Sequence, residues 1–433
     1  MSALKARIQA RQARVVVVGA GYVGLPLAVE TAAAGFPTVA FDKSAEKVRA
    51  INEGVSYIKD IPSPTLAPLV RSGRLTGSTD PEVLAQADAI VVCVPTPLNK
   101  TKDPDNSFIM AAADLIASRM RPQQLIVVES TTFPGFTREV LLPKLGASGF
   151  KLDRDFFVAF SPERVDPGNT KYFTKNTPKV IGGSSPASLE IATALYHTFV
   201  DDLIPVSSTD AAEMVKLLEN TFRAVNIGLV NEVAIMCHRL DLDVWEVIEA
   251  AATKPFGFMP FFPGPGLGGH CIPIDPLYLS WKLRTLKYNA RFIELADEVN
   301  SAMPDFVVQR IADALNDHKK ALNGSRILLS GITYKRDVDD IRESPAFDVI
   351  GLLQRRGAQV DYYDPYVPRT RIGDTIWHST PFEKIGDYDC VVIVTDHRTI
   401  DYPDLVDRAR LVVDCRNATR GLRHRYADKI VSL

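Results

Sequence analysis

Three glycines near the amino terminus limit the possible folds of this chain more than any other feature. Gly19, Gly21 and Gly24 form a G-x-G-x-x-G motif. The motif follows the apolar run Val15–Val18 and opens a stretch of helical character. Between a strand and a helix, such glycines make a tight turn whose backbone closely approaches a pyrophosphate, and the helix amino terminus faces the anion. Asp42 ends the next β-rich run, at about the 20-residue spacing of a dinucleotide fingerprint.

The residues around this motif favour NAD over NADP as the cofactor. A carboxylate at the end of the second strand accepts a hydrogen bond from the adenosine 2′-hydroxyl and repels a 2′-phosphate. Lys43 follows Asp42 directly, and a cation there can weaken the preference for NAD over NADP. Tyr22 and Val23, inside the motif, are further candidates for cofactor contact.

Short β-rich runs alternate with helical patterns through the first half of the chain, which predicts a parallel sheet. The runs are almost continuously apolar, as a sheet covered on both faces requires. The expected strands are Val15–Gly19, Thr38–Phe41, Ala89–Val94, Leu125–Val128, Phe156–Phe160 and Val180–Gly182. Ligands bind beyond the carboxyl ends of such strands, where the sequence places Thr96, Thr131 and Glu163. Ordinary turn chemistry explains each of these residues singly, but three at one edge indicate a site.

A helical region follows. Asp210 and Glu213 resemble a capping box at the start of a long helix that reaches about Leu240. A second helical stretch begins near Arg291, and Pro304 is expected to start a new helix because proline is disfavoured inside one. The basic segment 1–14 is expected to be a short solvated helix or arm.

The last third repeats the opening order of elements. A strand at Arg326–Gly331, a helix at Pro345–Arg356 and a strand at Gln359–Tyr363 ending at Asp364 predict a second βαβ domain, completed by strands at 390–394 and 411–413. The fold class is therefore α/β, with two Rossmann-like doubly wound domains joined by a helical central region. The expected domains are residues 1–208, which bind NAD, 209–305, which are helical, and 306–433.

Composition excludes several classes of function. The formal net charge is −2 and no basic patch is interleaved with aromatic residues, so a nucleic-acid partner is not expected. The longest apolar runs are strand-sized, which argues against a membrane span. The five cysteines are widely spaced without a C-x-x-C pair, so neither a disulfide framework nor a metal site is expected. A cytoplasmic location follows as an expectation.

One glycine-rich loop carries a candidate nucleophile. Cys271 follows four glycines within the segment Gly264–Asp275, and glycines let backbone approach a ligand closely. On the long helix, Lys216, Asn220 and Arg223 share one face. A nearby cation lowers the pKa of a thiol, and Lys216 is a candidate for that cation. A solvated helix stripe and a small core cysteine are the alternatives.

A thiol in a dehydrogenase indicates a particular chemistry. Oxidation of an alcohol to an aldehyde needs only a hydride acceptor and a base. A thiolate that adds to the aldehyde gives a thiohemiacetal, which can donate a second hydride and leave a thioester for hydrolysis. An NAD fold with a positioned cysteine therefore indicates a four-electron oxidation.

At this point the chain resembles a known family, the nucleotide-sugar 6-dehydrogenases of the UDP-glucose dehydrogenase superfamily. The resemblance extends from the glycine motif to Arg416. The motifs that carry it are Gly19–Gly24, Ser161–Glu163, Lys216–Asn220, Gly264–Asp275, Gly331–Lys335 and Asp339–Pro345.

The resemblance implies roles for individual residues. It implies that Cys271 is the nucleophile, that Lys216, Asn220 and Asp275 surround the reacting oxygen and a water, and that Glu163 assists thioester hydrolysis. Thr131 would lie near the nicotinamide and Arg342 would reach the NAD diphosphate. The residues implied to contact a UDP-sugar substrate are Arg164, Val165, Lys216, Asn220, Arg223, Gly268, Lys335, Arg336 and Arg416. The family's central helices form a dimer, so at least a homodimer is expected.

One departure narrows the expected substrate. Many UDP-glucose enzymes have a lysine just before the aspartate that follows the cysteine, whereas this chain has Cys271-Ile-Pro-Ile-Asp275. With the segment Ser161–Gly168, this run is similar to the N-acetylhexosamine branch. An N-acetylglucosamine nucleotide is the expected substrate, and N-acetylmannosamine or glucose nucleotides are alternatives. A two-electron β-hydroxyacid-type dehydrogenase and a catalytically silent binding protein are the competing functions.

Overall fold

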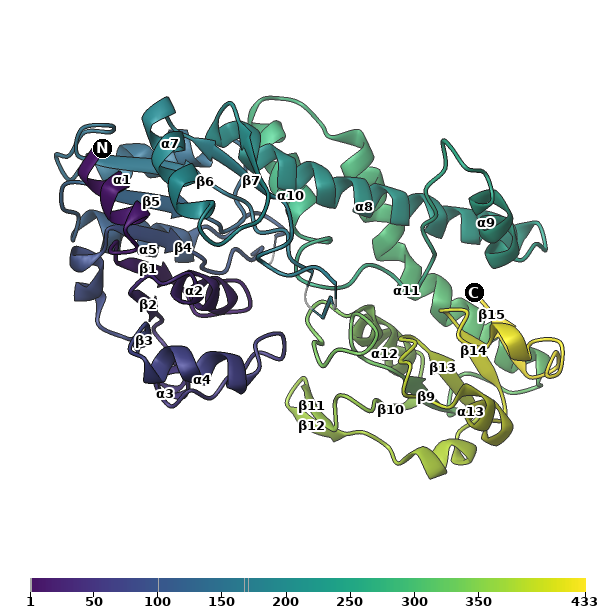
Figure 1. Ribbon diagram of the computed structural model, residues 1–433. Coiled ribbons are helices and arrows are strands. Elements are labelled where there is room, and N and C mark those ends of the chain that lie inside the picture. The colour runs from purple at the N-terminus through teal and green to yellow at the C-terminus, as the bar shows by residue number, and fades with distance from the viewer. Residues whose placement is uncertain (1, 100, 167, 170) are drawn as a thin grey trace. The chain divides into compact units, whose positions relative to one another are not determined.

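The computed structural model describes residues 2–99, 101–166, 168–169 and 171–433. The chain divides into two compact units. Unit 1 is Met1–Glu219 with Leu277–Tyr288, and unit 2 is Asn220–Pro276 with Asn289–Leu433. Each unit contains a doubly wound sheet (Figure 1). In the sequence, a segment of long helices lies between the strands of the first sheet and those of the second. The two Rossmann-like domains and the helical central region predicted from the sequence are confirmed.

An eight-stranded sheet organises unit 1, in the order β3-β2-β1-β4-β5-β6-β7-β8. Its strands are β1 (Val15–Val18), β2 (Thr38–Phe41), β3 (Leu75–Ser78), β4 (Ala89–Val92), β5 (Gln124–Val128), β6 (Phe156–Phe160), β7 (Lys179–Gly183) and β8 (Leu203–Val206). All pairs are parallel except β6 with β7, which is antiparallel, so the prediction of a wholly parallel sheet is wrong at this point. The short strands β3 and β8 escaped prediction because their exposed positions interrupt the apolar pattern.

Helices cover both faces of this sheet. They are α1 (Ser2–Gln9), α2 (Gly24–Ala33), α3 (Ala45–Asn52), α4 (Ser63–Arg71), α5 (Ser107–Ala117), α6 (Leu142–Gly146) and α7 (Pro186–Tyr196), with short turns η1 (Pro81–Gln86) and η2 (Thr137–Leu141). The amino-terminal segment does form a helix, but the expectation that it is solvated is wrong. Leu4 and Ile8 of α1 are fully buried, and Lys5 pairs with Glu190 of α7 at 2.6 Å.

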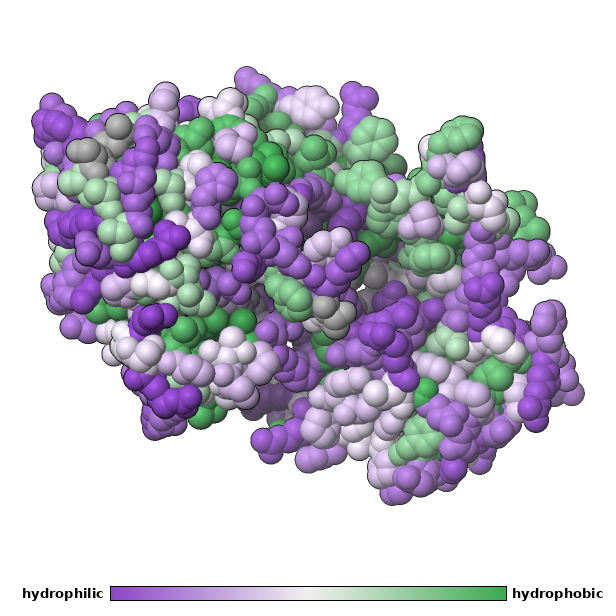
Figure 2. Space-filling view, in the orientation of Figure 1, coloured by the Kyte–Doolittle hydropathy of each residue, from purple (hydrophilic) through white to green (hydrophobic). Residues whose placement is uncertain are grey.

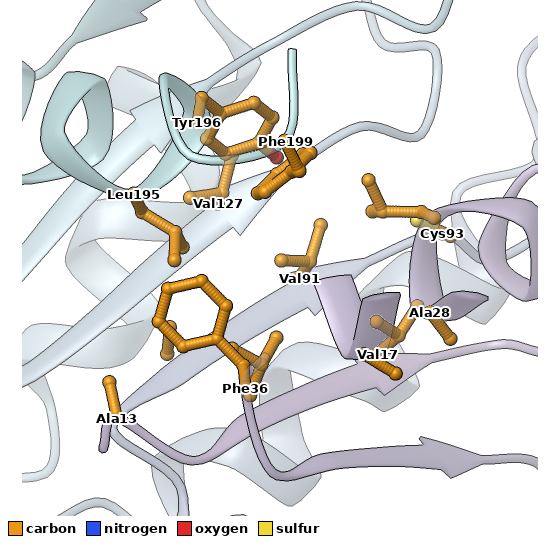
Figure 3. Packing of buried hydrophobic residues seen from close by; sticks show 14 of the residues in the cluster. Ala13, Val17, Ala28, Phe36, Val91, Cys93, Val127, Leu195, Tyr196 and Phe199 are labelled. Atoms are coloured by element: carbon orange, nitrogen blue, oxygen red, sulfur yellow. The ribbon is translucent and has the colours of Figure 1, made fainter. Parts of the chain in front are cut away.

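The alternation of side chains along β1 explains the two cores of unit 1. Val15 and Val17 point into one cluster, which Tyr196 and Phe199 share (Figure 3), whereas Val16 and Val18 point into the cluster on the other face. Successive residues of a strand face opposite sides, so a strand buried on both faces must be continuously apolar.

Long helices make up the middle of the chain. They are α8 (Thr209–Arg239), α9 (Val244–Ala252), α10 (Asp275–Thr285) and α11 (Arg291–Asp317). Pro304 lies inside α11 rather than at the start of a new helix, so that prediction is wrong. Proline lacks the N–H that would bond the carbonyl four residues back, here Asn300. The glycine loop packs at this carbonyl, since a Cβ on Gly266 would lie 3.4 Å from the Asn300 oxygen.

The second sheet, in unit 2, has the order β10-β9-β13-β14-β15 and is parallel throughout. Its strands are β9 (Arg326–Ser330), β10 (Gln359–Tyr363), β13 (Cys390–Ile393), β14 (Val412–Asp414) and β15 (Ile430–Ser432). Around it lie α12 (Pro345–Arg355), α13 (Tyr402–Arg408), η3 (Phe382–Asp387), η4 (Arg420–Leu422) and the hairpin β11 (Arg369–Ile372) with β12 (Thr375–His378). Among the described residues, no helix is both long enough and apolar enough to cross a bilayer.

Candidate active site

The glycine turn between β1 and α2 has the geometry that a dinucleotide needs. Gly19 has φ +96°, and a Cβ there would lie 2.5 Å from the Cys93 carbonyl oxygen. A Cβ on Gly24 would lie 1.7 Å from the Gly19 carbonyl oxygen. A Cβ on Gly21, by contrast, would meet nothing within 4 Å, which leaves open space where a pyrophosphate approaches the backbone. The residues present therefore fit NAD.

Asp42 lies at the carboxyl end of β2 and bonds to this turn. Its Oδ2 accepts the Ala20 N–H at 2.8 Å, and its Oδ1 accepts the Ser44 N–H at 2.9 Å. Lys43 is exposed, and the cation paired with Asp42 is Lys47, at 3.4 Å. Lys47 is one helical turn further along the chain, so sequence reasoning missed it.

Two further residues of the turn differ in their exposure. Tyr22 is 49% exposed at the surface of the turn, whereas Val23 is half-buried. Tyr57, which the sequence did not single out, donates its hydroxyl to the Ala20 carbonyl at 2.6 Å and supports the turn from the following segment.

Thr96 and Thr131 lie at the expected edge of the first sheet. Both side chains are buried, in the loops that follow β4 and β5. Ser130 Oγ donates to the Val94 carbonyl at 2.8 Å and joins these two loops. This hydrogen bond joins polar residues at the sheet edge beside the glycine turn.

Glu213 supports the loop after β5, rather than closing a capping box with Asp210 as predicted. Its carboxylate accepts the N–H groups of Gly135 at 2.6 Å and Thr137 at 2.9 Å, and the Thr137 hydroxyl at 2.6 Å. Ser208 caps the start of α8 by accepting the Ala211 N–H at 3.1 Å. Burial raises the pKa of Glu213 to about 7, despite these hydrogen bonds.

Glu163 belongs to a buried cluster of ionisable groups. Its Oε1 accepts the N–H groups of Arg164 at 2.8 Å and Val165 at 2.7 Å, and its Oε2 accepts from Lys179 Nζ at 3.0 Å. Lys179 also bonds Glu129 Oε2 at 2.9 Å. Burial alone raises the pKa of Glu163, but Lys179, the Val165 N–H and Lys216 outweigh it and hold the pKa below its usual value.

Other predicted residues of unit 1 interact with residues of the same chain. Arg164 pairs with Glu219 at 2.6 Å and donates to the Pro178 carbonyl at 2.6 Å. Lys216 is buried on α8, and its charge reaches Glu163. Within unit 1 the structure therefore brings Glu163, Arg164, Val165 and Lys216 into one region.

In unit 2, Asn220, Asp275 and Cys271 come together. Asn220 Nδ2 donates to Asp275 Oδ2 at 2.6 Å, and Asp275 is buried. The Asp275 N–H donates to the Cys271 carbonyl at 2.8 Å, which closes a turn at the start of α10. Cys271 is half-buried, and Arg223, one turn beyond Asn220 on α8, is exposed.

Buried amides and an arginine fix the start of the glycine loop. The Gly264 N–H donates to Asn231 Oδ1 at 3.0 Å. A Cβ on Gly264 would lie 2.5 Å from Arg416 Nη1. Further along, Cβ atoms on Gly268 and Gly269 would both lie 2.8 Å from the Tyr334 side chain. These glycines are therefore required by packing within unit 2, a reason that adds to their predicted approach to a ligand.

The predicted nucleotide-binding residues lie at the carboxyl end of the second sheet. Lys335 and Arg336 follow β9, and Thr333 Oγ1 donates to the Lys335 carbonyl at 2.8 Å. Arg336 pairs with Asp396. Arg416 follows β14 and donates from Nε to the Val394 carbonyl at 2.8 Å. Arg342 pairs with Asp340 at 2.6 Å, also in unit 2.

Sequence reasoning missed several residues that support the candidate site. Lys179, Tyr196, Tyr57, Asn231 and Asn300 were not predicted. The available signal for Lys179 was its position as a charged residue at the start of an apolar strand. In the part of the chain that the structure describes, no group of three or more His, Cys, Asp or Glu side chains is arranged to hold a metal, and all five cysteines are free thiols.

The fold and the site define a class of protein: a dehydrogenase with an amino-terminal NAD domain and a second nucleotide-type domain. Residues 13–200 match the NAD binding domain of the UDP-glucose/GDP-mannose dehydrogenase family, residues 210–302 its central domain and residues 328–421 its UDP binding domain. The chain belongs to this family, and it is an NAD-dependent UDP-sugar dehydrogenase. The resemblance predicted from the motifs is confirmed.

Named relatives cover nearly the whole chain. A UDP-N-acetyl-D-glucosamine 6-dehydrogenase from Pseudomonas aeruginosa is 33% identical over 391 residues, which is 89% of this chain and 90% of the relative. A UDP-N-acetyl-D-mannosamine dehydrogenase from Pyrococcus horikoshii is 34% identical over 410 residues, or 93% of this chain and 95% of the relative. The solved structure of a UDP-D-ManNAc dehydrogenase from Pyrococcus horikoshii matches with a TM-score of 0.86 and 33% identity, covering 94% of this chain and 96% of that one.

Proposed function

We propose that this enzyme oxidises the C6 hydroxyl of a UDP-N-acetylhexosamine to the carboxylate, with UDP-N-acetylglucosamine as its substrate. The run Cys271-Ile-Pro-Ile-Asp275 supports the N-acetylhexosamine branch, and one of the relatives above is named for UDP-N-acetylglucosamine. UDP-N-acetylmannosamine is the second candidate, because a relative named for it matches 93% of the chain.

One observation carries the proposal of a thiol mechanism. The buried Asp275 carboxylate accepts from Asn220 of α8, and the Asp275 backbone bonds the carbonyl of Cys271. The residue Cys271 thus lies in the same hydrogen-bonded turn as the carboxylate and the amide, and a covalent intermediate on its thiol would be held beside them.

The chain's own residues supply the following steps. NAD, when bound, would supply the hydride acceptor for both oxidations, and in the first of them the C6 hydroxyl loses its proton to a water at the reacting oxygen. Lys216 and Asn220 stabilise negative charge on the reacting oxygen, and Asp275 orients the lysine or a water. Cys271 adds as a thiolate to the C6 aldehyde, and the carbonyl oxygen takes up a proton to give a thiohemiacetal. Loss of the second hydride and of that proton leaves a thioester on Cys271.

Hydrolysis completes the reaction. A water loses a proton to Glu163 and attacks the thioester carbon, the C–S bond breaks and Cys271 leaves as a thiolate, which gives the uronic acid; Glu163 then releases the proton to solvent. Glu163 assists by orienting this water as an ionised carboxylate, a role consistent with its lowered pKa. Thr131 would lie near the same water and the nicotinamide.

Substrate binding is assigned to both nucleotide domains. Lys335, Arg336 and Arg416 would bind the UDP, in the stretch that matches the family's UDP binding domain. Arg223 and the Gly268 backbone would contact the sugar nucleotide with Arg164 and Val165. The NAD contacts proposed are Gly19, Gly21, Tyr22, Val23, Gly24, Asp42, Lys43, Thr96 and Arg342.

A substrate panel tests the choice of sugar. Purified enzyme is given NAD and each of UDP-N-acetylglucosamine, UDP-N-acetylmannosamine and UDP-glucose, NADH is followed by absorbance and the product mass is determined. We expect the highest kcat/KM with UDP-N-acetylglucosamine. A higher kcat/KM with either of the other two sugars would replace that assignment.

We also propose that a second copy of the chain covers an apolar stripe of α8. Phe222, Leu229 and Met236 recur at every seventh position and are 46%, 55% and 47% exposed. Figure 2 shows apolar residues gathered over α8 and around α9. Seventh-position spacing lines one side of a helix, the pattern of helix pairing. Leu229→Asp should convert the dimer into monomer in light scattering, whereas exposed Glu246→Lys should not.

Three expectations complete the proposal. The division into an NAD domain at 1–208, a central domain at 209–305 and a UDP-binding domain at 306–433 is supported by family matches that begin and end near these limits. A cytoplasmic location is consistent with five free thiols. No nucleic-acid or membrane partner is proposed.

A further inference from the structure

A chain of four buried side chains leads from the core of unit 1 to Glu163. Tyr196 donates its hydroxyl to Glu129 Oε1, Lys179 Nζ bonds Glu129 Oε2 at 2.9 Å, and the same ammonium bonds Glu163 Oε2 at 3.0 Å. Tyr196 is fully buried, and Glu129, Lys179 and Glu163 are 1%, 3% and 9% exposed. Figure 3 shows Tyr196 packed beside Phe199 in the core, so the first member of the chain is held rigidly.

Burial of three ionisable groups is costly unless each is paired, so this cluster is weak evidence for a gain in stability. A buried ion pair contributes little net stability, and apolar side chains of similar volume often replace one without loss. Here a single lysine serves two carboxylates, one of which is the group proposed to assist hydrolysis.

The groups that face Glu163 come from several elements. Lys179 begins β7, Glu129 follows β5, Tyr196 ends α7 and Lys216 lies on α8, with Cys93 after β4. Of these, Lys179 donates a hydrogen bond to the Glu163 carboxylate at 3.0 Å. Burial raises the pKa of Glu129 to about 7, although the Lys179 ammonium and the Tyr196 hydroxyl act to lower it.

We infer that Lys179 is a positioning residue for the reaction: its ammonium, anchored by Glu129 and Tyr196, holds Glu163 as an oriented carboxylate. The inference rests on the role proposed above for Glu163. The Arg164 and Val165 N–H groups fix one carboxylate oxygen of Glu163 and Lys179 fixes the other, so the plane and direction of the carboxylate are determined.

Removal of the ammonium has a predictable effect on chemistry. Without Lys179, burial favours the protonated form of Glu163, and a carboxylic acid neither orients nor deprotonates the attacking water. Thioester hydrolysis then slows while formation of the thioester continues. Because a higher pH restores the carboxylate, the loss of rate is largest at low pH.

The test compares Lys179→Met with Lys179→Arg, using NAD and UDP-N-acetylglucosamine. In Lys179→Met, rapid quenching and mass spectrometry should find a sugar nucleotide on Cys271, decaying about tenfold more slowly than in wild type at pH values below the acid limb, which is the loss that a rise of one pKa unit gives. The acid limb of the kcat profile should move up by about one pH unit. Lys179→Arg, which keeps the charge, should restore the limb. The matched control is Lys175→Met, which removes an exposed lysine nearby and should match wild type.

A second variant provides the same test if Lys179→Met folds poorly. Lys179→Gln keeps a hydrogen-bond donor toward both carboxylates but carries no charge, so the acid limb should again move to higher pH. An unmoved acid limb in both variants, or a loss of rate that is uniform with pH, would overturn the inference. The proposed function fails separately: wild-type enzyme would then form no adduct on Cys271 and release one NADH per sugar. A normal wild-type adduct with unchanged decay in Lys179→Met rejects the role of Lys179 alone.

Discussion

Asn231→Ala should loosen the glycine loop that carries Cys271. Asn231 is fully buried on α8; its Oδ1 accepts the Gly264 N–H at 3.0 Å, and its Nδ2 donates to Asn300 Oδ1 at 2.8 Å. Asn300 in turn donates to the Ala224 carbonyl at 3.1 Å. The pair of asparagines thus joins α8, α11 and the first residue of the loop.

The expected magnitude follows from the groups left without partners. With alanine at position 231, the buried Gly264 N–H and the buried Asn300 Oδ1 each lose the bond to this side chain. Each unsatisfied buried group costs about 1–3 kcal/mol. The free energy of unfolding of unit 2 should therefore fall by about 2–6 kcal/mol. Loss of a net hydrogen-bond contribution of about 1 kcal/mol at Gly264 should also speed exchange of its amide hydrogen about fivefold.

Two assays check this prediction. Urea unfolding gives the loss of stability, and hydrogen exchange with mass spectrometry of a peptide that covers the loop gives the local effect. The matched control is Asn226→Ala on the same helix, whose amide bonds the Phe222 carbonyl at an exposed position and should cost less than about 0.5 kcal/mol. If Asn231→Ala matches this control in both assays, the amide pair does not hold the loop and the reasoning is refuted.

Three further predictions concern unit 1. Gly24→Ala should prevent a stable glycine turn, because its Cβ would lie 1.7 Å from the Gly19 oxygen, whereas Gly21→Ala should fold normally and lose NAD affinity in a fluorescence titration. Equal effects of the two variants on folding would contradict this reading. Asp42→Ala should narrow the preference for NAD over NADP by about tenfold or more in kcat/KM, and an unchanged ratio would remove Asp42 from cofactor selection. The pKa of Glu213 is raised to about 7 from an ordinary value of 4.5, so the folded state binds this proton more tightly and loses stability as pH rises across that interval, by about 3 kcal/mol. Glu213→Gln should flatten this dependence in urea unfolding at pH values on both sides of the interval, and an unchanged slope would show that another group causes it.

Features coded by neighbouring residues were predictable from the sequence. The glycine turn, the strand before it and Asp42 lie within one short βαβ unit, whose motif specifies its own geometry. The Cys271 loop was recognisable for the same reason. The structure adds that Gly264, Gly268 and Gly269 are also needed to fit Arg416 and Tyr334.

Features made by tertiary packing were not predictable. Lys179 lies 50 residues from Glu129 and 16 from Glu163, and the sheet alone brings the three together. Nothing in the local sequence indicates that β7 runs antiparallel to β6. Pro304 stays inside α11 because burial of the helix outweighs the lost hydrogen bond, and burial of Leu4 and Ile8 in α1 depends on a distant core.

The ratio of NADH formed to UDP-sugar consumed tests the central claim most directly. With limiting UDP-N-acetylglucosamine and excess NAD, the four-electron mechanism through Cys271 predicts two NADH for each sugar, a uronic acid as the product and no free aldehyde. Cys271→Ser should lose the second oxidation. One NADH per sugar in the wild-type enzyme, or full activity in Cys271→Ser, would contradict the account.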